Sequence, residues 1–561
     1  MKKLRGLGGR NYSVLFHTHT VAGIVISFAL FVIFYAGAFS LFRDEVSQWE
    51  NPDMRQPVPE NLDLDQALLK VDSIYELNLY EFTNVSPPSE EYPVVYVYGA
   101  FNDTDSTTER MAAYVNPADM RVQDVKEPRT TLNTTIYYLH YFRQIPVIGL
   151  YLSGFVALFF LFAIVTGLLI HWRNLLTKFY AFVKEGKWKT IWTNAHTVLG
   201  VIGLPFQLIY AITGAFFGLL SLILLPAVFL LYDGDTEKVL NKINPSAALT
   251  VEENAPDYDH YSLTELAHRV EQQYPDFHIR NIRLRNYGKE DALALWNIDS
   301  HEGIHSSGVL AMRMKDGQIL EEYSILPNER SYSYSVINFI TKLHFGSFGG
   351  MTLRVIYFVL SMITCFMIIS GVLIWRTARD NKGYTFKQRL FHHRVTKWYL
   401  AICLSMFPAF ALIFLANKFV PMDLAGRVSW VNGIFFGGWL ALTLIGLLWN
   451  NYARLNRNYL FLGGVLSLGI PVANGIVTGD WFWKVWNTFP RVAYVDVFWL
   501  GAGLVSLYLV GRVLNVPEKS DKPVKEVTAT KPKAKAATVA RPKPKVISPQ
   551  LAISKIHRNL N

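Results

Sequence analysis

Eight long apolar runs separated by polar connections constrain this chain more than any other feature. They occupy about residues 21–41, 147–170, 198–231, 353–375, 399–416, 432–449, 459–477 and 493–514. Each is close to the roughly 20 residues that a helix needs to cross the hydrocarbon core of a bilayer. With 51% hydrophobic and only 17% charged residues, the chain is too apolar for an ordinary soluble protein. We therefore expect a mainly α-helical membrane protein with about eight transmembrane helices.

The distribution of Lys and Arg predicts the orientation of these helices, because positively charged residues stay on the cytoplasmic side of the membrane. Basic residues gather at 1–20 and in the connections 172–197 and 376–398, whereas segment 43–146 holds 18 Asp and Glu against 8 Lys and Arg. Both termini are thus expected in the cytoplasm, and 43–146 and 232–352 on the outer side. The net charge of +10 lies largely in the tail and cytoplasmic loops, which favours the lipid bilayer, not nucleic acid, as its partner.

The first apolar run has an alternative interpretation as a targeting segment. The first apolar run, with basic residues before it and Ala36-Gly37-Ala38 near its end, imitates a cleaved signal peptide. Because the same pattern returns at 196–216, a retained helix is expected.

The only two cysteines, Cys365 and Cys403, lie inside predicted spans. Their number excludes an iron–sulfur cluster, which needs four thiolates, and their position excludes disulfides in the outer loops.

The first four spans contain an internal repeat that carries histidine. A His-Thr-Val-x-Gly motif begins at His19 and returns at His196, and each is followed at the same spacing by Gly-Ala-Phe. The dipeptides Leu139-His140 and Leu343-His344 precede two further Gly-containing apolar motifs, again at one spacing. The predicted unit is helix, outer α+β module, helix, and two copies of such a unit usually pack about a pseudo-two-fold axis.

The repeat and the apolar runs together predict the domain organisation. In chain order it consists of a cytoplasmic N-terminus (1–20), a first span (21–41), a first outer module (43–146), a second span (147–171), a cytoplasmic loop (172–197), a third span (198–231), a second outer module (232–352), a fourth span (353–375), a cytoplasmic loop (376–398), a four-helix membrane extension (399–514) and a disordered basic tail (515–561). The four-helix extension has no polar clusters, so it is interpreted as a scaffold or a partner-binding part.

Each outer module is predicted to contain a short helix followed by strands. The predicted helices lie at 63–69 and at 262–267, where the second has a capping-box pattern, and the predicted strands lie at 94–98, 113–117, 292–296 and 309–314, with a hairpin at 315–318.

The repeat pairs His140 with His344 at the outer face and His19 with His196 at the inner face. Histidines at membrane depth are functional candidates, and facing imidazoles suit a haem with two axial histidines. His140 and His171 are 31 residues apart, which exceeds the bilayer core at about 1.5 Å per helical residue, so they belong to different sites. Two haem b groups stacked across the membrane therefore satisfy both pairs. Zinc is a weaker alternative because no carboxylate or thiolate accompanies these histidines.

Other histidines are interpreted differently. His171 has Trp375 as its repeat equivalent, and it could replace an inner ligand, bond a haem propionate or face lipid headgroups. His17 is expected on the surface, and His392 and His393 are expected to be solvated in a basic loop. The segment His301–His305 matches the H-E-x-x-H zinc-protease signature, but its glycine and its place between predicted strands indicate a loop instead of the helix that this chemistry needs.

With these residues in view, the sequence resembles the PepSY-associated transmembrane family over roughly residues 12–400. The resemblance rests on the histidine motifs above, on Gly167–His171, on Gly200 with Leu204-Pro205-Phe206, and on Gly371 with Trp375. It implies PepSY modules in the periplasm, a bacterial inner-membrane location and haem b bound by helix-end histidines. Gln207 departs from the pattern, because relatives place a further histidine there, and this puts in doubt any inner ligand carried over from that position.

The resulting functional hypothesis is a di-haem electron-transfer protein, a ferric-siderophore reductase that reduces ferric iron on the periplasmic side. The chain has no G-x-G-x-x-G dinucleotide motif, so a cytoplasmic reductase or membrane quinol is expected to supply the electrons. Two alternatives remain open at this point. PepSY modules resemble protease propeptides, so the protein could be a membrane-anchored regulator or inhibitor of a protease without redox activity, or its haems could serve copper or a periplasmic protein.

Overall fold

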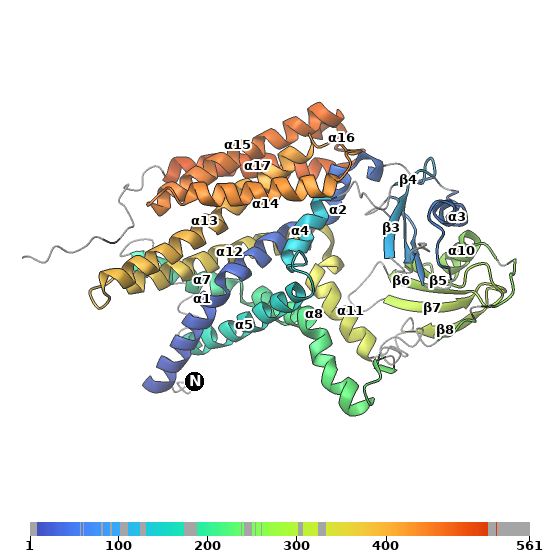
Figure 1. Cartoon of the computed structure of the whole chain (residues 1–561), viewed down its shortest axis with the longest axis horizontal. Helices are drawn as coiled ribbons and strands as arrows, with labels where there is room; N and C mark the ends of the chain where they lie inside the picture. The colour runs from blue at the N-terminus through green and yellow to red at the C-terminus, as the bar shows by residue number, and fades with distance from the viewer. Residues whose placement is uncertain are drawn as a thin grey trace, which may run out of the picture. The chain divides into compact units, whose positions relative to one another are not determined.

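The computed structural model describes residues 8–55, 58–59, 61–79, 82–89, 93–100, 110–123, 131–172, 188–236, 238–239, 249–252, 254–259, 261–300, 307–323, 332–513 and 523. All helices and strands below belong to the compact unit formed by residues 1–522 (Figure 1). The predicted tail 515–561, the segment His301–His305 and most of the predicted loop 172–197 lie outside the described residues.

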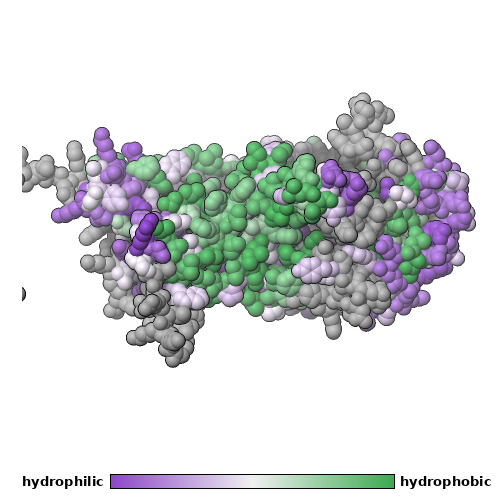
Figure 2. All heavy atoms as spheres, turned by 90° about the horizontal axis from the view of Figure 1, so that it is seen from below, coloured by the Kyte–Doolittle hydropathy of each residue, from purple (hydrophilic) through white to green (hydrophobic). Residues whose placement is uncertain are grey.

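Eight of the described helices are long and apolar enough to cross a membrane, which confirms the number expected from the apolar runs. They are α1 (Gly9–Ser40), α5 (Ile148–His171), α8 (Leu204–Leu231), α12 (Gly350–Arg379), α13 (Phe386–Asn417), α14 (Arg427–Gly446), α15 (Tyr452–Thr478) and α17 (Pro490–Val513). Large apolar side chains such as Val25, Leu230 and Ile476 are exposed on them, as lipid-facing residues would be. Figure 2 shows hydrophobic residues gathered over one face of these helices.

Two of the spans differ from their predicted form. Helix α1 begins at Gly9, well before residue 21, so His19 lies inside the helix and not at its end. The hydroxyls of Thr18 and Thr20 donate to carbonyls one turn back, which satisfies these polar groups within the helix. The predicted span 198–231 is divided between α7 (Trp188–Ile202) and α8, because Gly203 interrupts the helix and a proline follows in the first turn of α8.

A short helix precedes the second span and another precedes the fourth. These segments were expected to be the ends of the two modules, and no helix was predicted there. Helix α4 (Leu132–His140) ends at His140, and α11 (Tyr332–Phe345) ends one residue after His344. The left-handed conformation of Gly346 (φ 65°) ends α11, a common way for glycine to stop a helix. The other short helices are α2 (Arg43–Glu50), η1 (Pro52–Arg55), η5 (Ser347–Gly349) and α16 (Phe482–Val485).

The segments predicted as two separate modules join in one antiparallel sheet. Its strands are β1 (Thr83–Ser86), β2 (Val95–Ala100), β3 (Arg110–Val115), β4 (Val122–Gln123), β5 (Phe277–Arg285), β6 (Leu293–Ser300), β7 (Ser307–Arg313) and β8 (Ile319–Tyr323). They lie in the order β4-β3-β2-β1-β5-β6-β7-β8, so the two halves meet where Val85 of β1 pairs with Ile282 of β5. Pairing β1 with β5 covers one strand edge of each half, and β4 and β8 are the edges of the joined sheet.

Two helices, α3 (Leu64–Tyr75) and α10 (Leu263–Gln273), pack against this sheet (Figure 1). Asp65 of α3 accepts hydrogen bonds from the backbone N–H groups of Leu263 (2.7 Å) and Thr264 (3.0 Å) at the start of α10. In return, the Thr264 hydroxyl accepts one from the Leu64 N–H at 2.8 Å. The two modules thus cap each other's helices, which the sequence alone did not predict.

Helices α13 to α17 pack against α1, α2 and α12 through a large buried core that includes Phe39, Phe410, Phe414 and Trp499. The expectation for His393 is wrong, because this side chain is buried and its Nδ1 lies 2.7 Å from the Tyr452 hydroxyl. The basic charge around His393 suggested a solvated loop, but α13 begins at Phe386 and carries His393 into the helix bundle.

Candidate functional site

His19 and His196 lie next to each other within the helix bundle, with their rings in an edge-to-face arrangement. Their imidazole centroids are 6.2 Å apart and the ring planes meet at 73°. The Nδ1 of His19 lies 2.9 Å from the Ala163 carbonyl of α5, and the Nδ1 of His196 lies 2.9 Å from the Met367 carbonyl of α12. Ala163 and Met367 occupy equivalent positions of the sequence repeat, so the two histidines are held in the same way by the two copies.

His140 and His344 form a second pair, with ring centroids 6.0 Å apart and an interplanar angle of 43°. The Nδ1 of His140 lies 2.8 Å from the Ile33 carbonyl of α1. The Nδ1 of His344 lies 2.8 Å from the Thr213 hydroxyl, which itself donates to the Ile209 carbonyl. The oxygen of Thr213 is therefore the acceptor for an Nδ1–H of His344. The structure thus brings together both pairs that the repeat predicts.

The hydrogen bonds fix which ring nitrogen each histidine offers to a ligand. A carbonyl can only accept, so Nδ1 carries the proton in His19, His196 and His140, and Nε2 is left with a lone pair. A histidine that donates Nδ1–H to a carbonyl and offers Nε2 is the usual arrangement of an imidazole that ligates a metal.

The spacing of each pair fits one metal atom between two imidazoles. An imidazole nitrogen lies about 2 Å from a transition metal that it ligates, and its ring centroid lies about 1 Å further away. Two such ligands on opposite sides of one metal place their centroids about 6 Å apart. The observed 6.2 and 6.0 Å match this value. Both pairs therefore fit the axial ligands of a haem iron.

Glycines leave room for three of the four rings. A Cβ at Gly167 or Gly371 would lie 3.2 or 3.1 Å from Cε1 of His19 or His196, respectively. A Cβ at Gly37 would lie 2.5 Å from Nδ1 of His140, closer than atoms can approach. These glycines are the ones that the sequence repeats after each histidine motif. At these three positions the absence of a Cβ allows close packing against an imidazole, whereas Gly214, the repeat equivalent of Gly37, lies against Ala157.

The two pairs are separate sites at different depths along α1. His19 belongs to the first pair, and Ile33, whose carbonyl holds His140, lies 14 residues further along the same helix. At a rise of 1.5 Å per residue, the two positions are about 21 Å apart along the helix axis. One cofactor cannot reach both pairs. Among the described residues, no three or more His, Cys, Asp or Glu form a metal-binding group, so these histidines lie in pairs only.

His171 lies at the end of α5, one turn beyond Gly167 and thus near the His19–His196 pair. The ring that packs on His196 belongs to His19, so His171 is not a member of this pair. Its repeat equivalent, Trp375, packs on His392 with ring centroids 5.0 Å apart. Gln207 is buried and its amide lies 3.5 Å from the Thr364 hydroxyl, so its side chain is directed towards α12.

Sequence reasoning missed the groups that hold the second pair. Tyr210 donates its hydroxyl to the His344 carbonyl at 2.8 Å, and its ring lies 5.0 Å from the His344 ring. The Phe217 ring also packs on that histidine, with ring centroids 5.2 Å apart. Aromatic residues are frequent in every span of this chain, so nothing in the sequence distinguishes these two from lipid-facing ones.

A bundle of membrane-spanning helices with two histidine pairs at different depths, joined to a sheet made of two modules, defines a class of multi-pass membrane protein. The chain belongs to the family of the PepSY-associated TM region, which matches residues 16–378, well over half of its length. It is also 24% identical, over 296 residues, to a Pseudomonas aeruginosa protein described as uncharacterized; the similarity covers 50% of this chain and 71% of that protein. The helices from α13 onwards lie beyond the family match.

Proposed function

We propose that this protein is a di-haem transmembrane oxidoreductase. It reduces ferric iron, in the form of a ferric siderophore, on the periplasmic side of the bacterial inner membrane with electrons from the cytoplasm or the quinol pool. The observation that carries the proposal is that the structure has two histidine pairs. In each pair the ring centroids are as far apart as two imidazoles that ligate one metal atom. Haem b bound at each pair would supply one-electron chemistry at two depths of the bilayer.

The roles of the side chains follow from their contacts. His19 and His196 would hold one haem and His140 and His344 the other, each offering Nε2 while its Nδ1 is tied to a carbonyl or a hydroxyl. These bonds fix the rings before a cofactor binds, and tying Nδ1–H to an acceptor makes Nε2 a stronger ligand. His171 would bond a propionate of the first haem or replace one of its ligands.

The direction of electron flow follows from the end of the bundle at which the modules are attached. Helix α4 follows the first module in the chain and α11 follows the second, and these helices deliver His140 and His344. A ferric chelate recognised by the modules would therefore meet the His140–His344 pair first. Siderophores bind Fe(III) far more tightly than Fe(II), so reduction there releases the metal for import.

The visible spectrum of the purified protein, oxidised and then reduced with dithionite, tests the proposal. We expect the α-band of haem b and a content of two haems per chain, falling to one in His344→Ala. Reduction of a ferric siderophore, compared with a Cu(II) chelate, then tests the substrate. A colourless protein after expression with sufficient haem would overturn the proposal and favour the alternative of a protease regulator without redox activity.

A further inference from the structure

Helix α4 carries His140 as its last residue, and a buried carboxylate holds its first turn. Glu50 of α2 accepts hydrogen bonds from the backbone N–H groups of Thr131 (3.0 Å) and Leu132 (2.9 Å), and from the Thr131 hydroxyl (3.1 Å). The side chain of Glu50 is fully buried. A negative charge at a helix N-terminus satisfies free N–H groups and complements the helix dipole. The position of Glu50 thus fixes the start of α4.

The partners that balance the charge of Glu50 come from the C-terminal membrane extension. Arg427, at the start of α14, donates to Glu50 at 2.7 Å, and the Asn417 amide, at the end of α13, donates at 2.9 Å. The side chain of Arg427 is 2% exposed and also donates to the Thr131 hydroxyl at 2.8 Å. Further along α4, the Thr135 hydroxyl donates to Asn432 of α14 at 2.7 Å. The extension therefore contacts α4 both directly and through Glu50.

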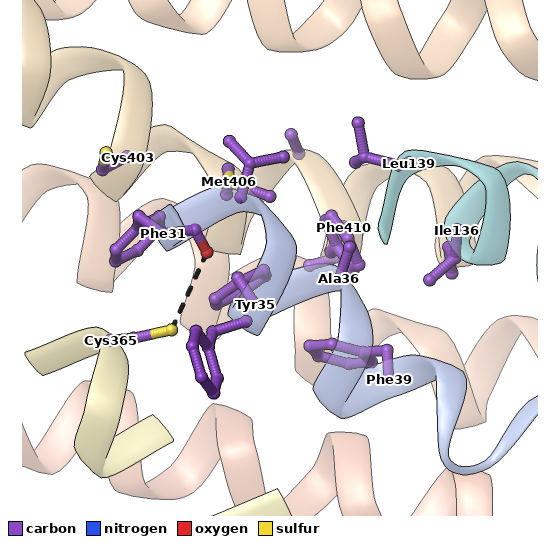
Figure 3. Close-up of a cluster of buried hydrophobic side chains, with 14 of the residues drawn as sticks. Phe31, Tyr35, Ala36, Phe39, Ile136, Leu139, Cys365, Cys403, Met406 and Phe410 are labelled. Carbon is purple, nitrogen blue, oxygen red and sulfur yellow. Dashed lines mark hydrogen bonds between the residues drawn. The ribbon is translucent and has the colours of Figure 1, made fainter. Parts of the chain in front are cut away.

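Apolar packing joins the same parts. Figure 3 shows Ile136 and Leu139 of α4 in one buried cluster with Ala36 of α1 and with Met406 and Phe410 of α13. A nine-residue helix is only about 14 Å long, so a shift of its first turn is passed along the helix to its last residue.

We propose that the C-terminal extension is a positioning element for His140, and that the Glu50–Arg427 ion pair is the group through which it acts. The extension lies outside the matched family region, and the sequence was interpreted there as a scaffold or a partner-binding part. The ion pair fixes the N-terminus of α4 and thereby the separation of the His140 and His344 rings. Glu50 and Arg427 are positioning residues, because neither contacts the histidine pair.

The extension has other polar attachments that provide a matched control. Arg55 of η1 pairs with Asp480 in the connection after α15, and the Trp49 indole donates to Asp496 of α17 at 2.8 Å. The Arg55–Asp480 ion pair also joins the segment after α1 to the extension, but it makes no contact with α4 among the described residues. If the ion pairs only attached the extension, removing either pair would have the same effect.

The test compares Glu50→Gln/Arg427→Met with Asp480→Asn in the full-length protein. Arg55 itself is kept, because it also donates to the carbonyls of Gln48 and Trp49 in α2, next to Glu50. The double variant removes both charges of its ion pair, and Asp480→Asn keeps an oxygen that can accept from Arg55. The first readout is hydrogen exchange of the amides of α4. The second is the low-temperature EPR spectrum and midpoint potential of each haem, with His344→Ala and His196→Ala used to assign the two signals.

In Glu50→Gln/Arg427→Met we expect exchange in α4 to accelerate by about tenfold or more, since charge-assisted hydrogen bonds to its first turn are lost. The signal of the His140–His344 haem should shift while that of the other haem stays. The control variant should leave α4 and both signals as in the native protein. Unchanged α4 exchange in Glu50→Gln/Arg427→Met, or equal changes in this variant and in Asp480→Asn, would overturn the proposal. The spectroscopic readout rests on the proposed function; a colourless protein would refute that function, while the exchange experiment would still decide this inference.

Discussion

Gly37 and Gly214 occupy equivalent positions of the sequence repeat but have different neighbours. A Cβ at Gly37 would overlap the His140 ring, whereas a Cβ at Gly214 would meet only the Ala157 methyl, at 3.2 Å. We expect Gly37→Ala to displace His140 and reduce the haem content towards one per chain, and Gly214→Ala to keep two. Pyridine haemochrome analysis of the purified variants measures this difference. Equal haem content in the two variants would show that the His140 ring does not need its observed position.

His344 differs from the other three histidines because a hydroxyl, that of Thr213, accepts from its Nδ1 in place of a carbonyl. The Ser370 hydroxyl, 3.3 Å from Nδ1 of His196, and the Thr166 hydroxyl, 3.4 Å from Nδ1 of His19, only supplement a carbonyl. The acceptor of His344 can therefore be removed by mutation. Thr213→Val keeps the shape and removes the acceptor, while Thr213→Ser keeps the hydroxyl. Because loss of an outer partner typically weakens metal binding by about 10- to 100-fold, we expect weaker haem retention at the His140–His344 pair in the valine variant only. Haem transfer to apomyoglobin gives the rate of loss, and similar rates for valine and serine would contradict this role.

At the scale of elements, Tyr287 links the two modules and makes their stability depend on pH. Its hydroxyl donates to Asp65 at 2.8 Å, and burial together with the Asp65 carboxylate raises the pKa of the Tyr287 phenol well above its usual value. The native state therefore keeps this proton at a pH where the unfolded chain, with a pKa of about 10, loses it. The resulting stabilisation is complete below about pH 10 and is lost as the pH rises further.

We expect the cooperative unfolding of the sheet to occur at lower temperature as the pH is raised from 9 to 11, and this decrease to be smaller in Tyr287→Phe. Thermal unfolding followed by circular dichroism at each pH measures the difference. Tyr274 contributes to the same pH dependence, because burial and the Glu322 carboxylate raise the pKa of its phenol too. The comparison with Tyr287→Phe isolates the contribution of the Tyr287–Asp65 contact. An identical pH dependence in both proteins would contradict the assignment.

The sequence predicted some elements well and others poorly for physical reasons. Apolar runs predicted all eight long helices, since lipid exposure requires continuous hydrophobicity. The strand Thr83–Ser86 was missed, because four residues show too little alternation and its role depends on pairing with β5, far away in the chain. For the same reason the sequence did not reveal that the modules share one sheet.

Of the candidate site, only the histidines at equivalent positions of the repeat could be predicted from the sequence. The pairing of His19 with His196 and of His140 with His344 followed from equivalent positions, and the structure places these rings together. The ion pair Glu50–Arg427 could not be foreseen, since the two residues are 377 positions apart and each looks like an ordinary interfacial charge. Long-range polar contacts leave no periodic signal in a single sequence.

At the scale of the whole molecule, the two pairs are about 21 Å apart along α1, so each can be removed without disturbing the other's contacts. Proteoliposomes with a reductant inside and an impermeable ferric chelate outside measure electron transfer across the bilayer. We expect His19→Ala and His344→Ala each to keep about one haem per chain and yet lose most of the transfer. A single remaining haem reaches only one side of the membrane.

The matched control is His268→Ala, because His268 is largely exposed on α10 and belongs to neither pair. It should keep two haems and native transfer. If His19→Ala retained full transfer while His344→Ala lost it, electrons from the enclosed reductant would reach the His140–His344 pair without the His19–His196 pair, and the proposed two-haem route would be wrong. If both variants retained full transfer, the two pairs would not form one route, and the observed spacing of the imidazoles would serve another purpose.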